Sequence, residues 1–252
     1  MMSNVQSLDR SLNLLELISK HSPISLNQLV SLSGLSKTTI HRLVQSLIEN
    51  DYVKKDHLTH QYELTYKLFQ LGYASIQNID YLNIAKSLIS KLAIDVGETC
   101  HLVLEDKDEV LYIEKFIPNE AQQSMSSKIG LRSPMYCTAV GKAILSTYND
   151  DTIHKIWQTT TVKAYTENTI IHFDNLMNEI NIIRQQGYAE DKEENEKGIF
   201  CIGAYFVNFR NEVQGAISLS FPTSQLDKKE FFVKQLKATA HSISKHLGFI
   251  VT

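Results

Sequence analysis

The chain has 252 residues, of which 43% are hydrophobic and 21% charged, and this composition predicts an ordinary folded core with enough length for two compact domains or one large one. The formal net charge of −3 excludes nucleic-acid binding through overall positive charge. Residues 1–60 hold six Lys or Arg against five Asp or Glu, so any basic surface must be local.

Three helices are predicted in the first fifty residues. The first runs over about 8–20, because four apolar residues recur there at helical spacing: Leu8, Leu12, Leu15 and Ile18. Ser25 with Gln28 forms a capping-box pattern for a short second helix over 26–33, which Gly34 ends. Ser36 occupies the N-cap of a third helix. Two short capped helices joined by a turn containing Gly predict a helix-turn-helix.

The third helix has two distinct faces. One narrow arc is apolar and consists of Ile40, Leu43, Val44, Leu47 and Ile48. The opposite side is polar and consists of Thr38, His41, Arg42, Gln45, Ser46 and Glu49. In a helix-turn-helix this side enters the major groove, where Arg can pair with guanine and Gln with adenine. Taken alone, the polar side is equally consistent with a solvated helix face.

A hairpin follows the third helix and favours the DNA-binding interpretation. Two short strands, 52–55 and 61–65, flank a polar loop, which makes the motif winged. We therefore expect double-stranded DNA as a partner. The residues predicted to contact it lie on the third helix and the hairpin: Ser36, Lys37, Thr38, Thr39, His41, Arg42, Gln45, Lys54, Lys55 and His57.

The remaining chain predicts a connector and a second domain. Residues 66–79 are interpreted as a helical linker that packs against something, a second subunit being one candidate, and another amphipathic helix starts near Leu82 and ends at Gly97. Two hairpins are predicted, turning at 106–109 and at 210–212, with helices at about 139–147, 172–186 and 227–247. This pattern predicts an α+β domain with an antiparallel sheet flanked by helices. The expected domains are 1–65, 66–79 and 80–252.

Two stretches of the second domain have residues suited to ligand binding. Small residues follow Thr138 at a helix start, which leaves room for a ligand, and the free N–H groups there favour a carboxylate. Close packing of the helix on the sheet explains the same small residues. An acidic run over 190–196 could turn Asp191 inward toward a sugar hydroxyl, although the charge run alone favours a solvated loop. Ser218 and Ser220 share one face of a strand, where they either bond locally or line a polar pocket.

Five segments occur in an order that resembles the IclR family of bacterial transcription regulators across essentially the whole chain: SLDRSLNLLELI, GLSKTTIHRLVQSL, YELTYKLFQLG, IGLRSPMYCTAVGKAIL and GYAEDKEENEKGIFCIGA. The resemblance implies a winged helix-turn-helix, a helical linker and a GAF-like effector domain. It also implies homodimers formed through the DNA-binding domains and often joined into homotetramers. Within the family, the similarity to regulators of sugar-acid catabolism implies a repressor that is released by a small effector, a keto or hydroxy carboxylate such as ketodeoxygluconate.

The resemblance also implies an effector site. Its residues, carried over by motif, are Met125, Thr138, Ala139, Val140, Gly141, Asp191, Ile199, Cys201, Ser218 and Ser220. Two departures from the close relatives concern the identity of the effector rather than the fold. Ile199-Phe200 stands where those relatives carry Leu-Arg, and AYFVNFRN is bulkier than the usual stretch. A regulator of a different carboxylate pathway therefore remains an alternative.

The residues offer little support for functions other than regulation. An enzyme would use Cys201 as a nucleophile with Asp191, or a metal held by His101, His154 and His172, but no spacing supports either. We therefore expect no catalytic residue, no metal and no cofactor. A DNA-binding protein without a ligand conflicts with a second domain of about 170 residues that looks built around a pocket.

The cellular location is also predicted from sequence. Three separated cysteines suit a reducing cytosol, and neither a signal peptide nor an apolar run of membrane-spanning length is recognised. These features predict a cytoplasmic protein with no membrane partner.

Overall fold

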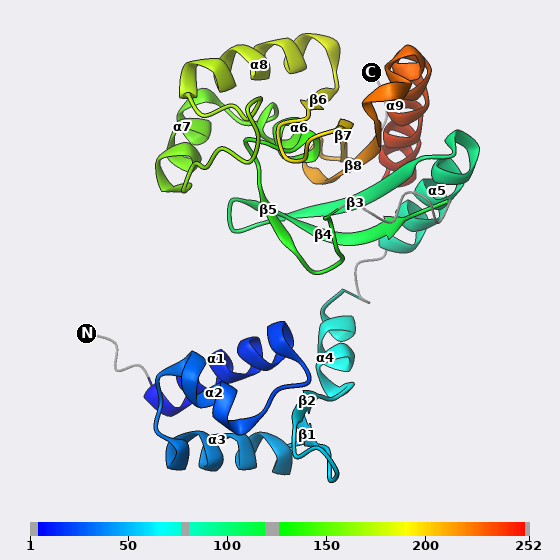
Figure 1. The fold of residues 1–252 in the computed structure, drawn as a ribbon. Coiled ribbons are helices and arrows are strands. Elements are labelled where there is room, and N and C mark those ends of the chain that lie inside the picture. The colour runs from blue at the N-terminus through cyan, green and yellow to red at the C-terminus, as the bar shows by residue number, and fades with distance from the viewer. Residues whose placement is uncertain (1–4, 77–80, 119–125, 250–252) are drawn as a thin grey trace. The chain divides into compact units, whose positions relative to one another are not determined.

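The computed structural model describes residues 5–76, 81–118 and 126–249. The chain divides into two compact units, Met1–Ile79 and Asp80–Thr252 (Figure 1). Within the described ranges, no helix is both long and apolar enough to cross a membrane.

The first unit is a three-helix domain with a hairpin. Its elements are α1 (Gln6–His21), α2 (Leu26–Ser33), α3 (Lys37–Glu49), β1 (Val53–Lys55), β2 (Tyr62–Leu64) and α4 (Lys67–Ile76). β1 and β2 pair antiparallel, and Ile24, just before α2, bridges to Tyr62 of β2. The bridge ties the hairpin to the start of the helix-turn-helix. The predicted winged helix-turn-helix is confirmed.

Local capping explains how the short helices of this unit form. α2 has only eight residues, which is too short to be stable in isolation. Ser25 Oγ accepts the Gln28 N–H at 3.4 Å and Gln28 Oε1 accepts the Ser25 N–H at 3.0 Å, so the predicted capping box is present. Gly34 ends the helix with φ +68°, and Ser36 Oγ accepts the Thr39 N–H at 3.2 Å to start α3. Sequence-local residues therefore set both helix boundaries.

The apolar arc of α3 forms the core of the first unit. Ile40, Leu43, Val44 and Leu47 are buried, together with residues of α1, α2 and the hairpin: Leu14, Ile18, Leu29, Val53 and Tyr62. Burying such side chains stabilises the fold by about 1.5–3 kcal/mol each. Because this arc faces the core, the polar side of α3 necessarily faces solvent.

The second unit is built on one sheet. Its elements are α5 (Tyr81–Val96), β3 (Thr99–Asp106), β4 (Glu109–Phe116), β5 (Arg132–Pro134), α6 (Ala139–Leu145), α7 (Asp150–Thr159), α8 (Phe173–Gln186), β6 (Ala189–Lys192), β7 (Ile199–Val207), β8 (Val213–Pro222) and α9 (Lys229–His246). The six strands are antiparallel in the order β5-β4-β3-β8-β7-β6. Both predicted hairpins form, and β3 pairs with β8 to join them into one sheet. The predicted α+β class is confirmed.

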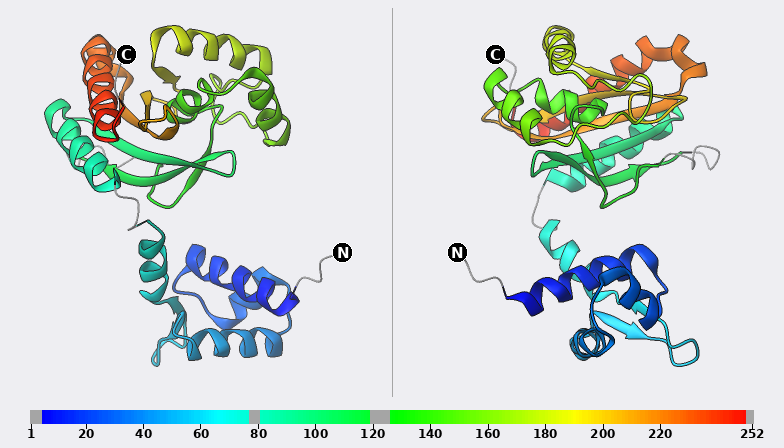
Figure 2. Two further views of the ribbon diagram at one scale, coloured as in Figure 1. Left: turned by 180° about the vertical axis from the view of Figure 1, so that it is seen from behind. Right: turned by 60° about the vertical axis from the view of Figure 1, so that its left-hand side comes forward.

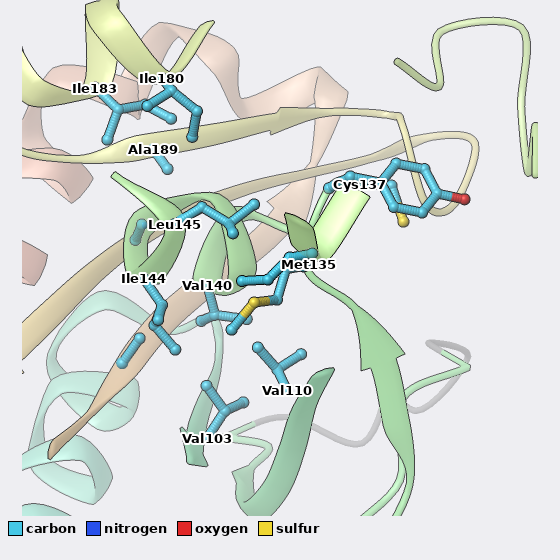
Figure 3. Packing of buried hydrophobic residues seen from close by; sticks show 14 of the residues in the cluster. Val103, Val110, Met135, Cys137, Val140, Ile144, Leu145, Ile180, Ile183 and Ala189 are labelled. Carbon is cyan, nitrogen blue, oxygen red and sulfur yellow. The ribbon is translucent and has the colours of Figure 1, made fainter. Parts of the chain in front are cut away.

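Helices cover both faces of this sheet. α5 and α9 lie side by side on one face, and α6 lies on the other with α7 and α8 beyond it (Figures 1 and 2). Figure 3 shows Val140 of α6 above Val103 and Val110 of the sheet, while Leu145 lies toward Ile180 and Ile183 of α8. α6 is thus buried between the sheet and α8.

Two glycines allow α6 to approach its neighbours this closely. A Cβ at Gly203 of β7 would come within 2.6 Å of the Ala139 carbonyl carbon and oxygen, at the first turn of α6. A Cβ at Gly141 would come within 2.3 Å of Met135 Cα. The close-packing explanation for the small residues therefore applies at Gly141.

Candidate functional site

The polar side of α3 forms a continuous exposed surface. Lys37, Thr38, His41, Arg42 and Gln45 line a shallow hollow along it. Leu26 of α2 borders the hollow, together with Ser46 and Glu49 of α3 itself. Five of the residues predicted to bind DNA are thereby brought together on one helix face, which is the arrangement that inserts into a major groove.

Two other predicted contacts on this helix have local bonds of their own. The Ser36 and Thr39 hydroxyls lie 2.8 Å apart, and both take part in capping α3. Gln45 Nε2 donates to Glu49 Oε1 at 3.2 Å, an exposed bond that a base edge could replace. Ser36 and Thr39 therefore shape the helix start, whereas Arg42 and Gln45 present the groups suited to base reading.

The hairpin holds the remaining predicted DNA contacts at the surface, Lys54 and Lys55 on β1 and His57 in the loop. Asp56 Oδ1 accepts N–H bonds from Leu58 at 2.9 Å and Thr59 at 2.7 Å, which closes the loop. Lys54 pairs with Glu63 at 2.8 Å, but its side chain is 64% exposed, so the pair is weak and exchangeable. Lys55 and His57 are also exposed. The hairpin thus presents Lys54 and Lys55 to phosphate oxygens.

The second unit has a partly open cavity of about 30 Å³ between the sheet and the start of α6. Eight of the residues predicted to bind effector line it: Thr138, Ala139, Val140, Asp191, Ile199, Cys201, Ser218 and Ser220. Gly141 lies outside this lining, against Met135, and Met125 lies outside the described residues. The cavity has room for about one water molecule, so a larger ligand requires it to widen.

The acidic run is not a solvated loop. Glu190, Asp191 and Glu194 are all buried, which corrects the interpretation favoured by charge density alone. Asp191 Oδ1 accepts the N–H of Glu194 at 2.7 Å and that of Asn195 at 3.4 Å. Burial, and then the neighbouring Glu194 carboxylate, raise the pKa of Asp191 to about 7 despite the opposing charge of Lys142. The cavity therefore contains a carboxyl group that can hold a proton near neutral pH.

His101 is a lining residue that the sequence did not identify as part of this site. It is buried on β3, with Nδ1 3.2 Å from Ser218 Oγ and Nε2 2.9 Å from Ser127 Oγ. Burial lowers the pKa of His101 to about 3, assisted by the nearby Lys115 charge, so the ring is neutral at physiological pH. A neutral imidazole between hydroxyls can donate at one nitrogen and accept at the other.

The other lining residues missed from sequence are Tyr112, Ser126, Ser127, Asn195 and Glu196. Glu196 Oε2 accepts two hydrogen bonds from Ser126, one from its backbone N–H at 3.1 Å and one from its hydroxyl group at 2.7 Å. These bonds join the β4–β5 connection to the β6–β7 connection. Tyr112 lies within β4, and the only sequence signal of the other four was polarity between predicted elements. No Lys or Arg is found among the described residues that line this cavity. The polar groups it can offer a ligand are hydroxyl, carboxyl, imidazole and backbone groups.

The thiol in the cavity lacks the properties of a nucleophile. Ser220 Oγ donates to Cys201 Sγ at 3.0 Å across the β7–β8 pair. Burial, and then the Asp191 charge, raise the pKa of Cys201 well above its usual value, so the reactive thiolate is disfavoured. His101, His154 and His172 lie on separate elements, and no metal-binding group of three ligands forms within the part of the chain that the structure describes.

A winged helix-turn-helix joined to an α+β unit with a small polar cavity defines a two-part DNA-binding protein. The chain belongs to the IclR family of bacterial transcriptional regulators. The model of the IclR helix-turn-helix domain matches residues 7–57, and the model for the bacterial transcriptional regulator IclR C-terminal domain matches residues 73–245. The family predicted from the sequence segments is confirmed.

Individual relatives are regulators as well. The chain is similar to the HTH-type transcriptional regulator KdgR of Escherichia coli (strain K12), with 32% identity over 248 residues that cover 98% of this chain and 94% of that protein. It is 33% identical to the DNA-binding transcriptional repressor YiaJ of the same strain over 251 residues, covering 98% and 89%. The crystal structure of Thermotoga maritima IclR superposes with a TM-score of 0.83 at 28% identity, covering 98% of this chain and 100% of that one.

Proposed function

We propose that this regulator is a homodimeric repressor of sugar-acid catabolic genes, released from its operator by a small hydroxylated carboxylate that binds in the cavity of the second unit. The observation that carries the proposal is the cavity lining. Asp191, His101, Ser218 and Ser220 present hydrogen-bonding groups to one small, partly open cavity. Such a lining complements the hydroxyl and keto groups of a sugar acid better than an apolar or aromatic ligand.

The carboxylate of the effector needs partners other than a cationic side chain. A protonated Asp191 can donate one hydrogen bond, and the first N–H groups of α6, next to Ala139 and Val140, can donate others. The similarity to KdgR supports ketodeoxygluconate as the first effector to test. Release then follows if the effector binds one conformation of the dimer more tightly than the operator-bound one.

Fluorescence anisotropy with the protein's own upstream DNA tests this function. The full-length protein is titrated onto labelled upstream DNA at fixed salt, with and without ketodeoxygluconate, because phosphate contacts make affinity strongly salt-dependent. Specific binding that the sugar acid weakens is the expected result. Specific binding that ignores it would remove ketodeoxygluconate as the effector while leaving the regulator in place.

The small cavity favours one second candidate. From a volume of about 30 Å³, the cavity would have to widen less for a smaller keto acid than for a six-carbon sugar acid. Pyruvate added in the same titration distinguishes the two, since release by pyruvate alone would assign the protein to a different carboxylate pathway.

A further inference from the structure

A fully buried lysine lies directly behind the cavity. Lys142 of α6 is 0% exposed, and its Nζ lies 2.5 Å from Glu194 Oε1 and 3.9 Å from Glu179 Oε1. The other oxygen of Glu194, Oε2, is buried without a hydrogen-bond partner among the described residues. An apolar pair of similar volume often replaces such an ion pair with no loss of stability. Stability alone therefore gives weak grounds for this arrangement.

The pair connects two walls of the cavity. One wall is the start of α6, where Thr138, Ala139 and Val140 lie within one turn of Lys142. The other wall is Asp191, whose Oδ1 accepts the backbone N–H of Glu194. Glu194 therefore makes two contacts: its backbone N–H bonds to the Asp191 carboxyl group, and its side chain pairs with Lys142 of α6.

The turn around Glu194 has further restraints. Thr166 Oγ1 donates to the Glu193 carbonyl oxygen, and Thr169 Oγ1 donates to that of Glu194, each at 2.6 Å. These bonds fix the backbone of the turn from the α7–α8 connection. The side chain of Glu194 is the part that fixes the turn to α6.

We propose that Lys142 and Glu194 are positioning residues for the effector cavity: their buried ion pair holds Asp191 at a fixed place opposite the start of α6. This inference rests on the proposed effector site. It assigns the pair to effector response, and not to DNA binding, which the first unit performs.

Electrostatics gives the pair a signature that a purely structural role lacks. Asp191 is surrounded by Lys142 from α6, Glu194 and Glu196 from the β6–β7 connection, and Cys201 from β7. Tyr112 and His101 also line the cavity, and Cys137, outside the lining, interacts electrostatically with Asp191. The Glu194 charge raises the pKa of Asp191 and the Lys142 charge lowers it. We therefore expect removal of the Glu194 charge to lower the pKa of Asp191, and removal of the Lys142 charge to raise it.

The test uses the full-length variants Lys142→Met and Glu194→Gln. Ketodeoxygluconate binding is measured by isothermal titration calorimetry from about pH 5 to about pH 9, a range that brackets the Asp191 titration. The pH midpoint of binding is expected to shift upward by about one unit in Lys142→Met and downward in Glu194→Gln. Glu167→Gln is the matched control. It weakens an exposed ion pair to Lys197, which lies in the same β6–β7 connection as Glu194, and it should leave the pH midpoint of binding unchanged.

Amide hydrogen exchange followed by mass spectrometry gives a second readout that needs no ligand. Both variants are expected to speed exchange in a peptide spanning residues 190–196 and to leave peptides of α3 unchanged. If Lys142→Met fails to fold, Glu194→Gln alone decides: its binding midpoint must shift downward and its exchange in residues 190–196 must become faster. Unaltered exchange in this peptide, or midpoints that shift in the same direction, would overturn the positioning role.

Failure of the proposed effector is distinguishable from failure of this inference. A wild-type protein that binds no ketodeoxygluconate removes that effector, and amide exchange in residues 190–196 then decides the role of the pair by itself. Faster exchange in both variants but not in Glu167→Gln supports it.

Discussion

Arg42 is the single side chain of the first unit whose chemistry is best suited to reading a base. It is exposed on α3 beside Gln45, in the hollow that the polar face forms. Replacing Arg42 with Ala should cost about 1–3 kcal/mol of discrimination if it pairs bidentately with guanine. Anisotropy with operator and scrambled DNA at one salt concentration measures this loss.

The control for Arg42 removes the same charge elsewhere. Arg210 is exposed on the β7–β8 turn of the second unit, where it stacks on Phe209. Arg210→Ala should leave the ratio of operator to scrambled affinity unchanged. An Arg42→Ala protein with an unaltered ratio would contradict the assignment of α3 as the reading helix.

Asp191 should make effector binding depend on pH. Its folded-state pKa of about 7 lies above the ordinary value of 3.8. Below pH 7 the neutral carboxyl group can donate to an anionic effector, and above pH 7 the charged group repels it. Affinity for ketodeoxygluconate should therefore fall as pH rises through about 7, by at most about tenfold per pH unit for one linked proton. Calorimetry across this range measures the slope, and Asp191→Asn should abolish it.

The same group should lower stability at high pH. Because folding raises the pKa of Asp191, its contribution to stability is complete below pH 3.8 and is lost as pH rises through about 7. Asp191→Asn should therefore be more stable than wild type above pH 7, with the difference vanishing in acid. Urea unfolding at several pH values measures this, with the exposed Asp95→Asn as the control. An identical pH profile for wild type and Asp191→Asn would contradict the buried titration.

Among the elements, α6 depends on a glycine in the strand beneath it. A Cβ at Gly203 would meet the carbonyl group of Ala139 at 2.6 Å, which is backbone and cannot rotate away. Gly203→Ala should therefore destabilise the protein by about 1–3 kcal/mol through overpacking. It should also weaken effector binding, because Ala139 lines the cavity. Urea unfolding and calorimetry measure the two effects.

A second glycine provides the control. Gly72 lies in α4, where an added Cβ would meet nothing within 4 Å. Gly72→Ala should leave stability unchanged or raise it by about 1 kcal/mol, because alanine is the better helix former. Equal losses in the two variants would contradict the close contact between β7 and α6.

The elements were predictable from sequence where the determining residues are local. The caps at Ser25 and Ser36, the stop at Gly34 and the two hairpins all follow from neighbouring residues, and all are present. Three elements were not predicted: α7, β5 and β6. The pattern of α7 was missed, although it has ten residues and an N-cap at Asn149. β5 and β6 have three and four residues, too few for a period to emerge.

The cavity was only partly predictable, because it depends on pairing between distant residues. Ser218 was identified from strand alternation, but His101 lies 117 positions away and meets it only through the β3–β8 pair. The acidic run was misinterpreted for a similar reason. Its counter-charge, Lys142, lies inside an otherwise apolar helix 52 positions before Glu194. Non-local contacts of this kind leave no pattern within a sequence window.

At the scale of the whole molecule, the exposed apolar side chains of the first unit support the proposed dimer. Tyr66 is 89% exposed, Phe69 71% and Tyr73 53%. Phe69 and Tyr73 are four residues apart and so lie on one side of α4, and Tyr66 immediately precedes this helix. Val5, Leu8 and Leu12 are exposed around the start of α1. Apolar side chains exposed along one helix, as on α4, are typical of an interface with another protein.

Phe69→Glu should therefore weaken self-association and operator binding together. A charge at a buried interface position is costly, and a monomer can occupy only one half-site of a two-fold symmetric operator. Sedimentation equilibrium measures the first effect and anisotropy the second. Phe209→Glu is the control, since Phe209 is 66% exposed on the β7–β8 turn of the second unit. If Phe69→Glu keeps wild-type mass and full operator affinity, α4 is not the dimer contact, and the operator must be bound through a different surface of the first unit.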